Sequence, residues 1–317
     1  MNHYFETDIL TIKLYHLIVA ILLFGIMILY LKIAEKYKLS YIRGGGIIFW
    51  FAGIIFSIIY LPQSIFFLIG FTLICGVGFW KDISPLPIAI RLIIQLIAVG
   101  VVIFDFSTYF SFSWWLTLVF CGCCVGTINM FSLMDEISRG MTGLYSLVIL
   151  GCLQYVNQNI VTFTHPDFII YGILACLIFL FFNYRRPVIC SAGNIGSAGI
   201  AFWIVILLLQ LILTTHNFVW ISFLAVYGID TICTMIYRLC LKYLKFGKLH
   251  SSRNWVRKTE YPHLLLPAIY AMIQLIICVI NINLGNKISI TILASTQLGL
   301  LVAIYVLKFQ YDSDNIK

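Results

Sequence analysis

The chain has 317 residues and a formal net charge of +8, and 62% of its residues are hydrophobic while only 10% are charged. Soluble domains carry about 25% charged residues, so this chain cannot cover a water-exposed surface of its size. The composition therefore excludes a pair of soluble domains, a disordered chain and a disulfide-rich secreted scaffold. It indicates an all-α integral membrane protein.

Apolar runs of helical length follow one another along the chain. A helical span needs about 20 apolar residues, and backbone polar groups find no water in the bilayer core, so each run is predicted to be a helix. Residues 1–317 are predicted to form a single transmembrane domain, a polytopic helical bundle. About eleven spans are predicted in chain order, at 12–31, 47–61, 64–80, 89–105, 113–131, 142–157, 167–183, 196–214, 218–240, 263–282 and 288–307.

The basic residues predict the orientation of the spans. With the N-terminus outside, all of the 20 Lys and Arg residues except Lys13 and Lys287 fall on one side. Cytoplasmic loops are enriched in Lys and Arg, so this side is predicted to be the cytoplasm. The net charge then reflects topology and contacts with lipid headgroups, and no nucleic-acid partner is expected.

Polar and glycine-rich segments gather at this predicted cytoplasmic face, at the ends of different spans. They are Arg43–Gly46, Gly78–Pro87 with Arg91, Asn129–Gly143, Asn183–Arg186, Cys190–Ser197 and the basic loop 241–262. Asn129, Ser132 and Asp135 recur every three residues and are predicted to share roughly one helix face. Segment 192–197 opens a helix, where free backbone N–H groups can hold an anion. Together the segments predict a phosphate-binding surface at the membrane boundary.

Two features have alternative interpretations. The basic loop 241–262 either recognises a sugar and a diphosphate, or lies as an interfacial helix on anionic lipid. Asp230 lies inside the ninth predicted span, where acidic residues are costly. It is either a structural hydrogen-bond partner or an acid that contacts the residues of the site without contacting the substrate.

The order of these motifs resembles the polyprenyl-phosphate N-acetylhexosamine-1-phosphate transferases, the membrane family typified by MraY and WecA. The resemblance covers about residues 40–270, most of the chain. It is carried by Arg43–Gly46, Gly78–Asp82 with Ser84-Pro85 and Arg91, Asn129–Asp135 with Thr142–Tyr145, Asn183, Ala192-Gly193, Gly196-Ser197, Asp230 and His263.

The resemblance implies transfer of a sugar phosphate from a UDP-linked N-acetylhexosamine to a polyprenyl phosphate, such as undecaprenyl phosphate, with release of UMP. Such a reaction initiates cell-envelope glycan synthesis. The resemblance implies catalytic roles for Lys81, Asp82 and Asp135, and Mg²⁺ ligands at Asp82, Asp135 and Glu136. The substrate-binding residues that it implies are Arg43, Asn129, Asn183, Asn194, Gly196, Ser197 and His263. Membrane lipids are expected partners, and a homodimer is left open.

The chain departs from the family pattern at positions that matter for Mg²⁺. Lys81 and Asn194 stand where the family has Asp, Glu136 stands where it has Gly, Ser138-Arg139 replace Asp or Asn followed by Gly, and Glu260 stands where an earlier histidine aligns. The changes at 81 and 194 alone raise the charge of the site by three units, which is comparable with the charge of the missing cation.

Two hypotheses follow from these departures. In the first, Lys81 takes over part of the electrostatic role of Mg²⁺, and transfer proceeds without tight metal binding. In the second, the protein is a catalytically impaired paralogue that binds polyprenyl phosphate or nucleotide sugar without turnover. Glu136 complicates both, because with Asp82 and Asp135 it could rebuild a metal site. A transporter or channel is a third hypothesis, but its polar residues should line a path at mid-membrane.

Overall fold

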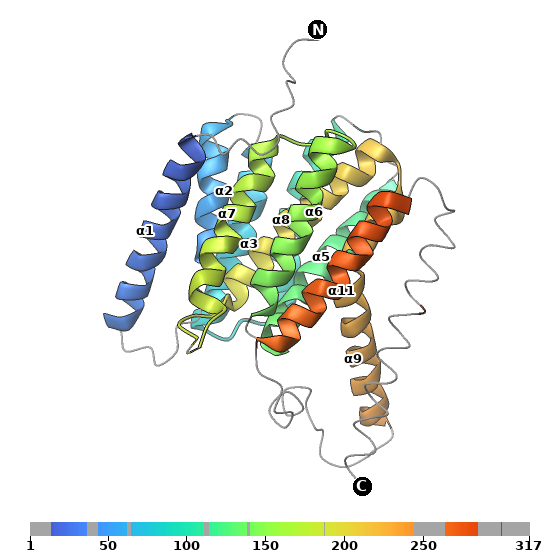
Figure 1. The fold of residues 1–317 in the computed structure, drawn as a ribbon. Coiled ribbons are helices and arrows are strands. Elements are labelled where there is room, and N and C mark those ends of the chain that lie inside the picture. The colour runs from blue at the N-terminus through green and yellow to red at the C-terminus, as the bar shows by residue number, and fades with distance from the viewer. Residues whose placement is uncertain are drawn as a thin grey trace.

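The computed structural model describes residues 14–36, 44–61, 65–108, 110, 114–137, 140–186, 188–243, 264–284 and 299. Within these residues the elements are helices, and Figure 1 shows them packed side by side as a bundle. They are α1 (Leu14–Lys36), α2 (Ile47–Ile59), α3 (Ile65–Ile83), α4 (Ile88–Ser107), α5 (Trp114–Ile137), α6 (Met141–Asn159), α7 (Pro166–Asn183), α8 (Gly193–Thr215), the 3-10 helix η1 (Phe218–Leu224), α9 (Ala225–Tyr243) and α11 (Leu265–Leu284).

Seven of the described helices are long and apolar enough to cross a membrane, namely α1, α3, α4, α5, α7, α8 and α11. Large apolar side chains remain exposed along α1, α4 and α5, where a soluble protein would carry polar groups. The prediction of a multi-pass helical membrane protein is therefore confirmed. The predicted span 288–307 lies outside the described residues.

Two helix boundaries differ from the hydropathy prediction in a way that affects the site. The α3 helix continues to Ile83 and α5 to Ile137, beyond the predicted span ends at 80 and 131. Both helices thus extend past their apolar stretch, because backbone hydrogen bonding does not stop where hydrophobicity does. Lys81, Asp82 and Asp135 consequently lie on rigid helix ends and not in loops.

The ninth predicted span, 218–240, is divided into η1 and α9. The side chain of Asn217 accepts a hydrogen bond from the Val219 N–H at 2.9 Å, which caps the 3-10 helix. The Ser222 hydroxyl donates to the Val219 carbonyl, and this local bond competes with the regular helical pattern. The continuous α-helix starts only at Ala225.

The central element is α8, and nearly all of its residues are buried. A helix that is apolar on every face is typical of a core position. It contacts α2, α3, α5 and α6, so its neighbours hold its first residues in place. We call the end of the bundle that contains the start of α8 the site end. The end that contains the starts of α1 and α7 is the opposite end, which lies uppermost in Figure 1.

Candidate functional site

The carboxylate of Asp82, on the last turn of α3, closes the N-terminus of α8. Its Oδ1 accepts hydrogen bonds from the backbone N–H of Asn194 at 3.0 Å and from the Asn194 Nδ2 at 2.8 Å. Its Oδ2 accepts from the backbone N–H of Ile195 at 3.1 Å. A negative charge at a helix N-terminus is stabilised by the exposed N–H groups and by the helix dipole. Two of the N–H groups that segment 192–197 was predicted to offer to an anion are therefore bonded to the chain's own carboxylate.

Lys81 and Asn194 form a matched pair beside this carboxylate. The Lys81 Nζ donates to the Asn194 Oδ1 at 2.5 Å, while the Nδ2 of the same amide donates to Asp82. One end of the amide therefore meets a cation and the other meets an anion. A carboxylate at position 194 could not donate to Asp82 and would repel it. We refer to Lys81, Asp82 and Asn194 as the amide-bridged network.

Glycines allow three backbone segments to meet at this point. A Cβ on Gly46 would lie 2.2 Å from the Cα of Gly196. The backbone N–H groups of Gly45 and Gly46 donate to the carbonyls of Ser191 and Ala192 at 2.8 and 3.1 Å. Any larger residue at either contact would separate the segments. The glycine loop, residues 44–46, is thereby joined directly to the start of α8.

Gly193 has a backbone conformation that suits glycine alone. Its φ is +68°, in the left-handed region, and a Cβ there would lie 2.6 Å from the Asp82 Oδ2. The residue therefore satisfies two requirements, a tight entry into α8 and room for the capping carboxylate. The glycine that begins the motif Gly193 to Ser197 is thus required by the local structure of this chain.

The polar residues of α5 each meet a different helix. Asn129 Nδ2 donates to Gln95 Oε1 on α4 at 2.9 Å, Ser132 Oγ accepts from Ser197 Oγ on α8 at 3.4 Å, and Asp135 Oδ1 accepts from Thr142 Oγ1 on α6 at 2.7 Å. Each step of three residues rotates a side chain by about 60° around a helix of 3.6 residues per turn. The three residues therefore span about 120° of the α5 surface, and each connects α5 to a different neighbouring helix.

Two residues at the site end were given no role by the sequence. Cys190 is fully buried, and a Cβ on Gly45 would lie 2.6 Å from its Sγ. Burial raises the pKa of the Cys190 thiol to about 12, and the negative charge of Asp135 adds to this effect. Tyr30 of α1 lies against the glycine loop, where a Cβ on Gly44 would meet its hydroxyl at 2.9 Å. A tyrosine near the end of an apolar run resembles an ordinary interfacial anchor, so its sequence signal is weak.

The end of α7 connects the site to the start of α11. Asn183 Nδ2 donates to the Cys190 carbonyl at 2.7 Å, and the Tyr184 hydroxyl donates to the Leu264 carbonyl at 2.6 Å. Burial raises the pKa of the Tyr184 hydroxyl. His263 lies outside the described residues, but the next residue of the chain is at the site end.

Three further predicted features lie wholly or partly outside the description. Arg43 precedes the glycine loop and is not described, and neither is most of the basic loop 241–262. Glu136 belongs to α5, but its side chain is outside the described part.

Asp230, on α9, is buried, and both its carboxylate and that of Asp135 are within electrostatic range of the Tyr227 hydroxyl.

Of the three Mg²⁺ ligands that the resemblance implies, Asp82 and Asp135 have described side chains, and both accept hydrogen bonds from the chain itself. Among the residues that the structure describes, no group of three or more His, Cys, Asp or Glu side chains is placed to hold a metal ion. Both oxygens of Asp82 are bonded to α8, and the Lys81 ammonium lies on the neighbouring amide. Mg²⁺ requires oxygen ligands in near-octahedral geometry, whereas here a cationic side chain adjoins the carboxylate.

Comparison with known proteins finds no family model that matches the chain and no matching curated relative. The resemblance to the polyprenyl-phosphate transferases therefore remains a prediction from the motifs.

Proposed function

We propose that the chain transfers an N-acetylhexosamine-1-phosphate from a UDP-sugar to a polyprenyl phosphate at the site end. The observation that supports this best is the meeting of the glycine loop, the end of α3 and the start of α8, with α5 joined to α8 at Ser132. These are the segments on which the family resemblance depends. A lipid phosphate and a water-soluble nucleotide can meet only at the end of the spans, because charged groups are costly at mid-membrane.

In this proposal the acceptor is itself the nucleophile. An oxygen of the lipid phosphate forms a bond to the β-phosphorus of the UDP-sugar, the bond from that phosphorus to the bridging oxygen breaks, and UMP leaves with the electron pair. Catalysis of such a displacement is mainly positioning and neutralisation of charge. Lys81 supplies positive charge on the end of a rigid helix, and Asn194 and Asp82 orient it. Asp135 positions the reacting groups from α5.

The proposal includes the arrangement of the chain in the membrane. It has eleven spans with the N-terminus outside, so that the site end faces the cytoplasm, as the distribution of Lys and Arg favours. The membrane is the bacterial inner membrane, undecaprenyl phosphate is the acceptor, and the product is the first lipid-linked intermediate of a cell-envelope glycan.

A second candidate function is binding of polyprenyl phosphate or nucleotide sugar without turnover. The amide-bridged network favours it, because Asp82 is one of the retained acids and both of its oxygens hold the start of α8. The lone pairs with which Asp82 accepts these hydrogen bonds are not available to coordinate a metal ion. The two candidates share the ligands and differ in whether Lys81 and Asp135 suffice for the chemistry.

Release of UMP distinguishes the two candidates. Purified protein in nanodiscs, given undecaprenyl phosphate and a panel of UDP-N-acetylhexosamines, is expected to release UMP. Asp135→Asn is expected to lower the rate about 100-fold, the usual effect of removing one group that stabilises a transition state. Asp105→Asn, a matched change near the far end of α4, is expected to leave the rate unchanged.

The same preparation tests the second candidate by thermal unfolding. A ligand that binds only the folded protein raises its melting temperature, and the rise grows with the ratio of ligand concentration to Kd. No UMP from any sugar, together with a higher melting temperature in undecaprenyl phosphate or UDP-sugar, would establish binding without turnover. If no UMP is released and no ligand shifts the melting temperature, both candidates are contradicted.

A further inference from the structure

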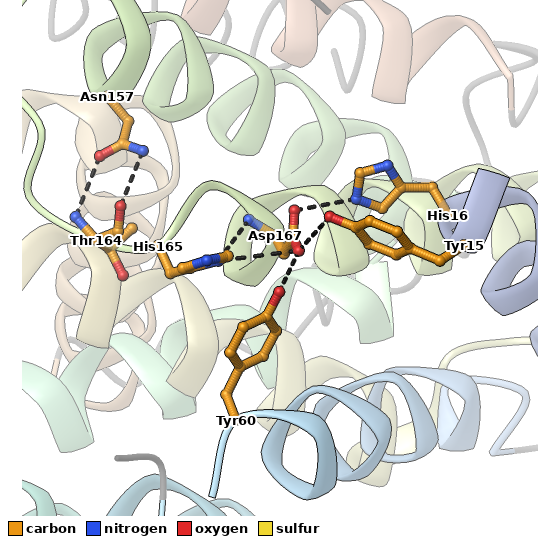
Figure 2. Close-up of polar contacts among 7 residues, drawn as sticks. All are labelled: Tyr15, His16, Tyr60, Asn157, Thr164, His165 and Asp167. Carbon is orange, nitrogen blue, oxygen red and sulfur yellow. Dashed lines mark hydrogen bonds and ion pairs between the residues drawn. The ribbon is translucent and has the colours of Figure 1, made fainter. Parts of the chain in front are cut away.

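At the opposite end of the bundle, the Asp167 carboxylate joins α1 and α2 to α7 (Figure 2). Asp167 lies in the first turn of α7 and is 4% exposed. Its Oδ2 accepts hydrogen bonds from the Tyr15 hydroxyl of α1 at 2.6 Å and from the Tyr60 hydroxyl at the end of α2, and its Oδ1 is 3.0 Å from the His16 Nε2 of α1. We call Tyr15, His16, Tyr60 and Asp167 the Asp167 clamp.

The Asp167 clamp supplies directional contacts to a helix that has few means of making them. Residues 17–29 of α1 are all apolar, and most of them are exposed along the outside of the bundle. Lipid tails are as apolar as these side chains, so a bilayer provides no hydrophobic force that presses α1 onto its neighbours. Polar contacts near the ends of α1 therefore decide where the helix lies.

The other end of α1 packs on the glycine loop of the site. A Cβ on Gly44 would lie 2.9 Å from the Tyr30 hydroxyl, and a Cβ on Gly45 would lie 3.2 Å from the Met27 Cε. The same Cβ would lie 2.6 Å from the Cys190 Sγ. A helix rises about 1.5 Å per residue, so α1 is a rigid connection of about 22 Å between the Asp167 clamp and Tyr30.

We propose that Asp167 is a positioning residue for the site at the other end of the bundle. The Asp167 clamp holds α1 against α7, and α1 in turn holds the glycine loop over Cys190 and the start of α8. Loss of the clamp releases α1 and uncovers Cys190. The effect on sugar-phosphate transfer rests on the proposed function, whereas the mechanical coupling does not.

Cys190 serves as a natural reporter of this coupling. In nanodiscs, Asp167→Asn is expected to increase the rate at which N-ethylmaleimide labels Cys190, measured by peptide mass spectrometry after timed exposure. The expected increase is about tenfold, which corresponds to an opening made easier by about 1.4 kcal/mol. Tyr15→Phe removes one donor of α1 and is expected to give a smaller increase. Cys75, buried between α3 and α8 next to Gly199, is expected to stay protected in every variant.

Asn157→Ala is the matched control, because it weakens the same end of the bundle without touching α1. The Asn157 Oδ1 accepts from the backbone N–H groups of Phe163 and Thr164 at 2.9 and 3.1 Å, and its Nδ2 donates to the Thr164 carbonyl (Figure 2). This change is expected to lower the melting temperature while Cys190 remains protected.

Two results would overturn the proposal. One is that Asn157→Ala exposes Cys190 as much as Asp167→Asn does, because general loosening would then explain the labelling. The other is that Cys190 stays protected in both Asp167→Asn and Tyr15→Phe. The Tyr15→Phe variant keeps the carboxylate and removes only one of its contacts to α1, so it provides the test if Asp167→Asn does not fold. Labelling needs no substrate, so its outcome is independent of whether UMP is released.

Discussion

Replacing Gly78 by alanine is expected to disrupt the site end, whereas the same change at Gly76 is expected to be tolerated. A Cβ on Gly78 would lie 2.7 Å from both the Asn194 carbonyl oxygen and the Ile195 Cα. These are backbone atoms of the central helix, which cannot move aside as a flexible side chain would. Forcing extra atoms into such a contact costs at least about 1–3 kcal/mol. A Cβ on Gly76 meets nothing within 4 Å.

Thermal unfolding of the two variants in the same nanodiscs measures the difference. Both changes replace glycine by alanine on α3, so helix propensity, which favours alanine by about 1 kcal/mol, affects them equally. Gly78→Ala should melt at a clearly lower temperature than the wild type, and Gly76→Ala at the same or a higher temperature. Equal melting temperatures for the two variants would show that α3 and α8 do not approach as closely as described.

Placing acids at positions 81 and 194 is expected to make stability depend on a divalent cation. In the double variant Lys81→Asp with Asn194→Asp, three carboxylates at positions 81, 82 and 194 repel one another, and the hydrogen bond to Lys81 is lost. The positions are partly exposed, so the cost without metal is about 1 kcal/mol. Mg²⁺ binds carboxylate oxygens and stabilises a protein when it binds the folded state alone, so it should reverse the loss. The wild type should melt alike in Mg²⁺ and in EDTA.

Two comparisons make this prediction specific. Asn194→Asp alone keeps Lys81 as a counter-charge and should show a weaker dependence on Mg²⁺ than the double variant. Lys36→Asp makes the same charge change as Lys81→Asp, but on the exposed end of α1, and should show none. If the double variant melts alike in Mg²⁺ and in EDTA, then position 194 does not bridge Lys81 and Asp82 as we describe.

The helices could be predicted because hydropathy is a local property of the chain. Each predicted span up to residue 282 overlaps described helices, and the differences are at the ends, apart from the division of 218–240 into η1 and α9. The extensions of α3 and α5 were missed for a physical reason. Hydropathy marks where a helix leaves the apolar layer, but a helix ends where capping or a change of backbone direction stops its hydrogen bonding.

The site could be predicted only as a collection of motifs. Asp82, Asp135 and the segment 193–197 were singled out correctly as residues at one end of the spans. The sequence did not predict that Asp82 caps α8, because its partners Asn194 and Ile195 lie 112 and 113 residues away. The segment 192–197 alone predicts an open anion site, and only the packing of α3 against α8 fills it.

The Asp167 clamp was missed for the same reason. The ends of apolar runs contain Tyr15-His16 in one place and Asp167 in another. Polar residues at such positions usually only contact lipid headgroups or water. Tyr15 and Asp167 are 152 residues apart, and no spacing rule connects them. Their mutual contact appears only when α1 is laid against α7.

The amino-acid sequence by itself determined that this is a membrane protein of packed helices with its chemistry-bearing residues at span ends, because apolar length and charge distribution act through the solvent around each segment. The tertiary structure decided which of those residues meet. The lipid does not distinguish one apolar helix from another, so close glycine contacts and a few polar bonds between distant segments determine which helices pack together. Those contacts turn Asp82 and Asn194 into a closed network with Lys81 and bring α1 into the site, and neither outcome can be read from any single stretch of chain.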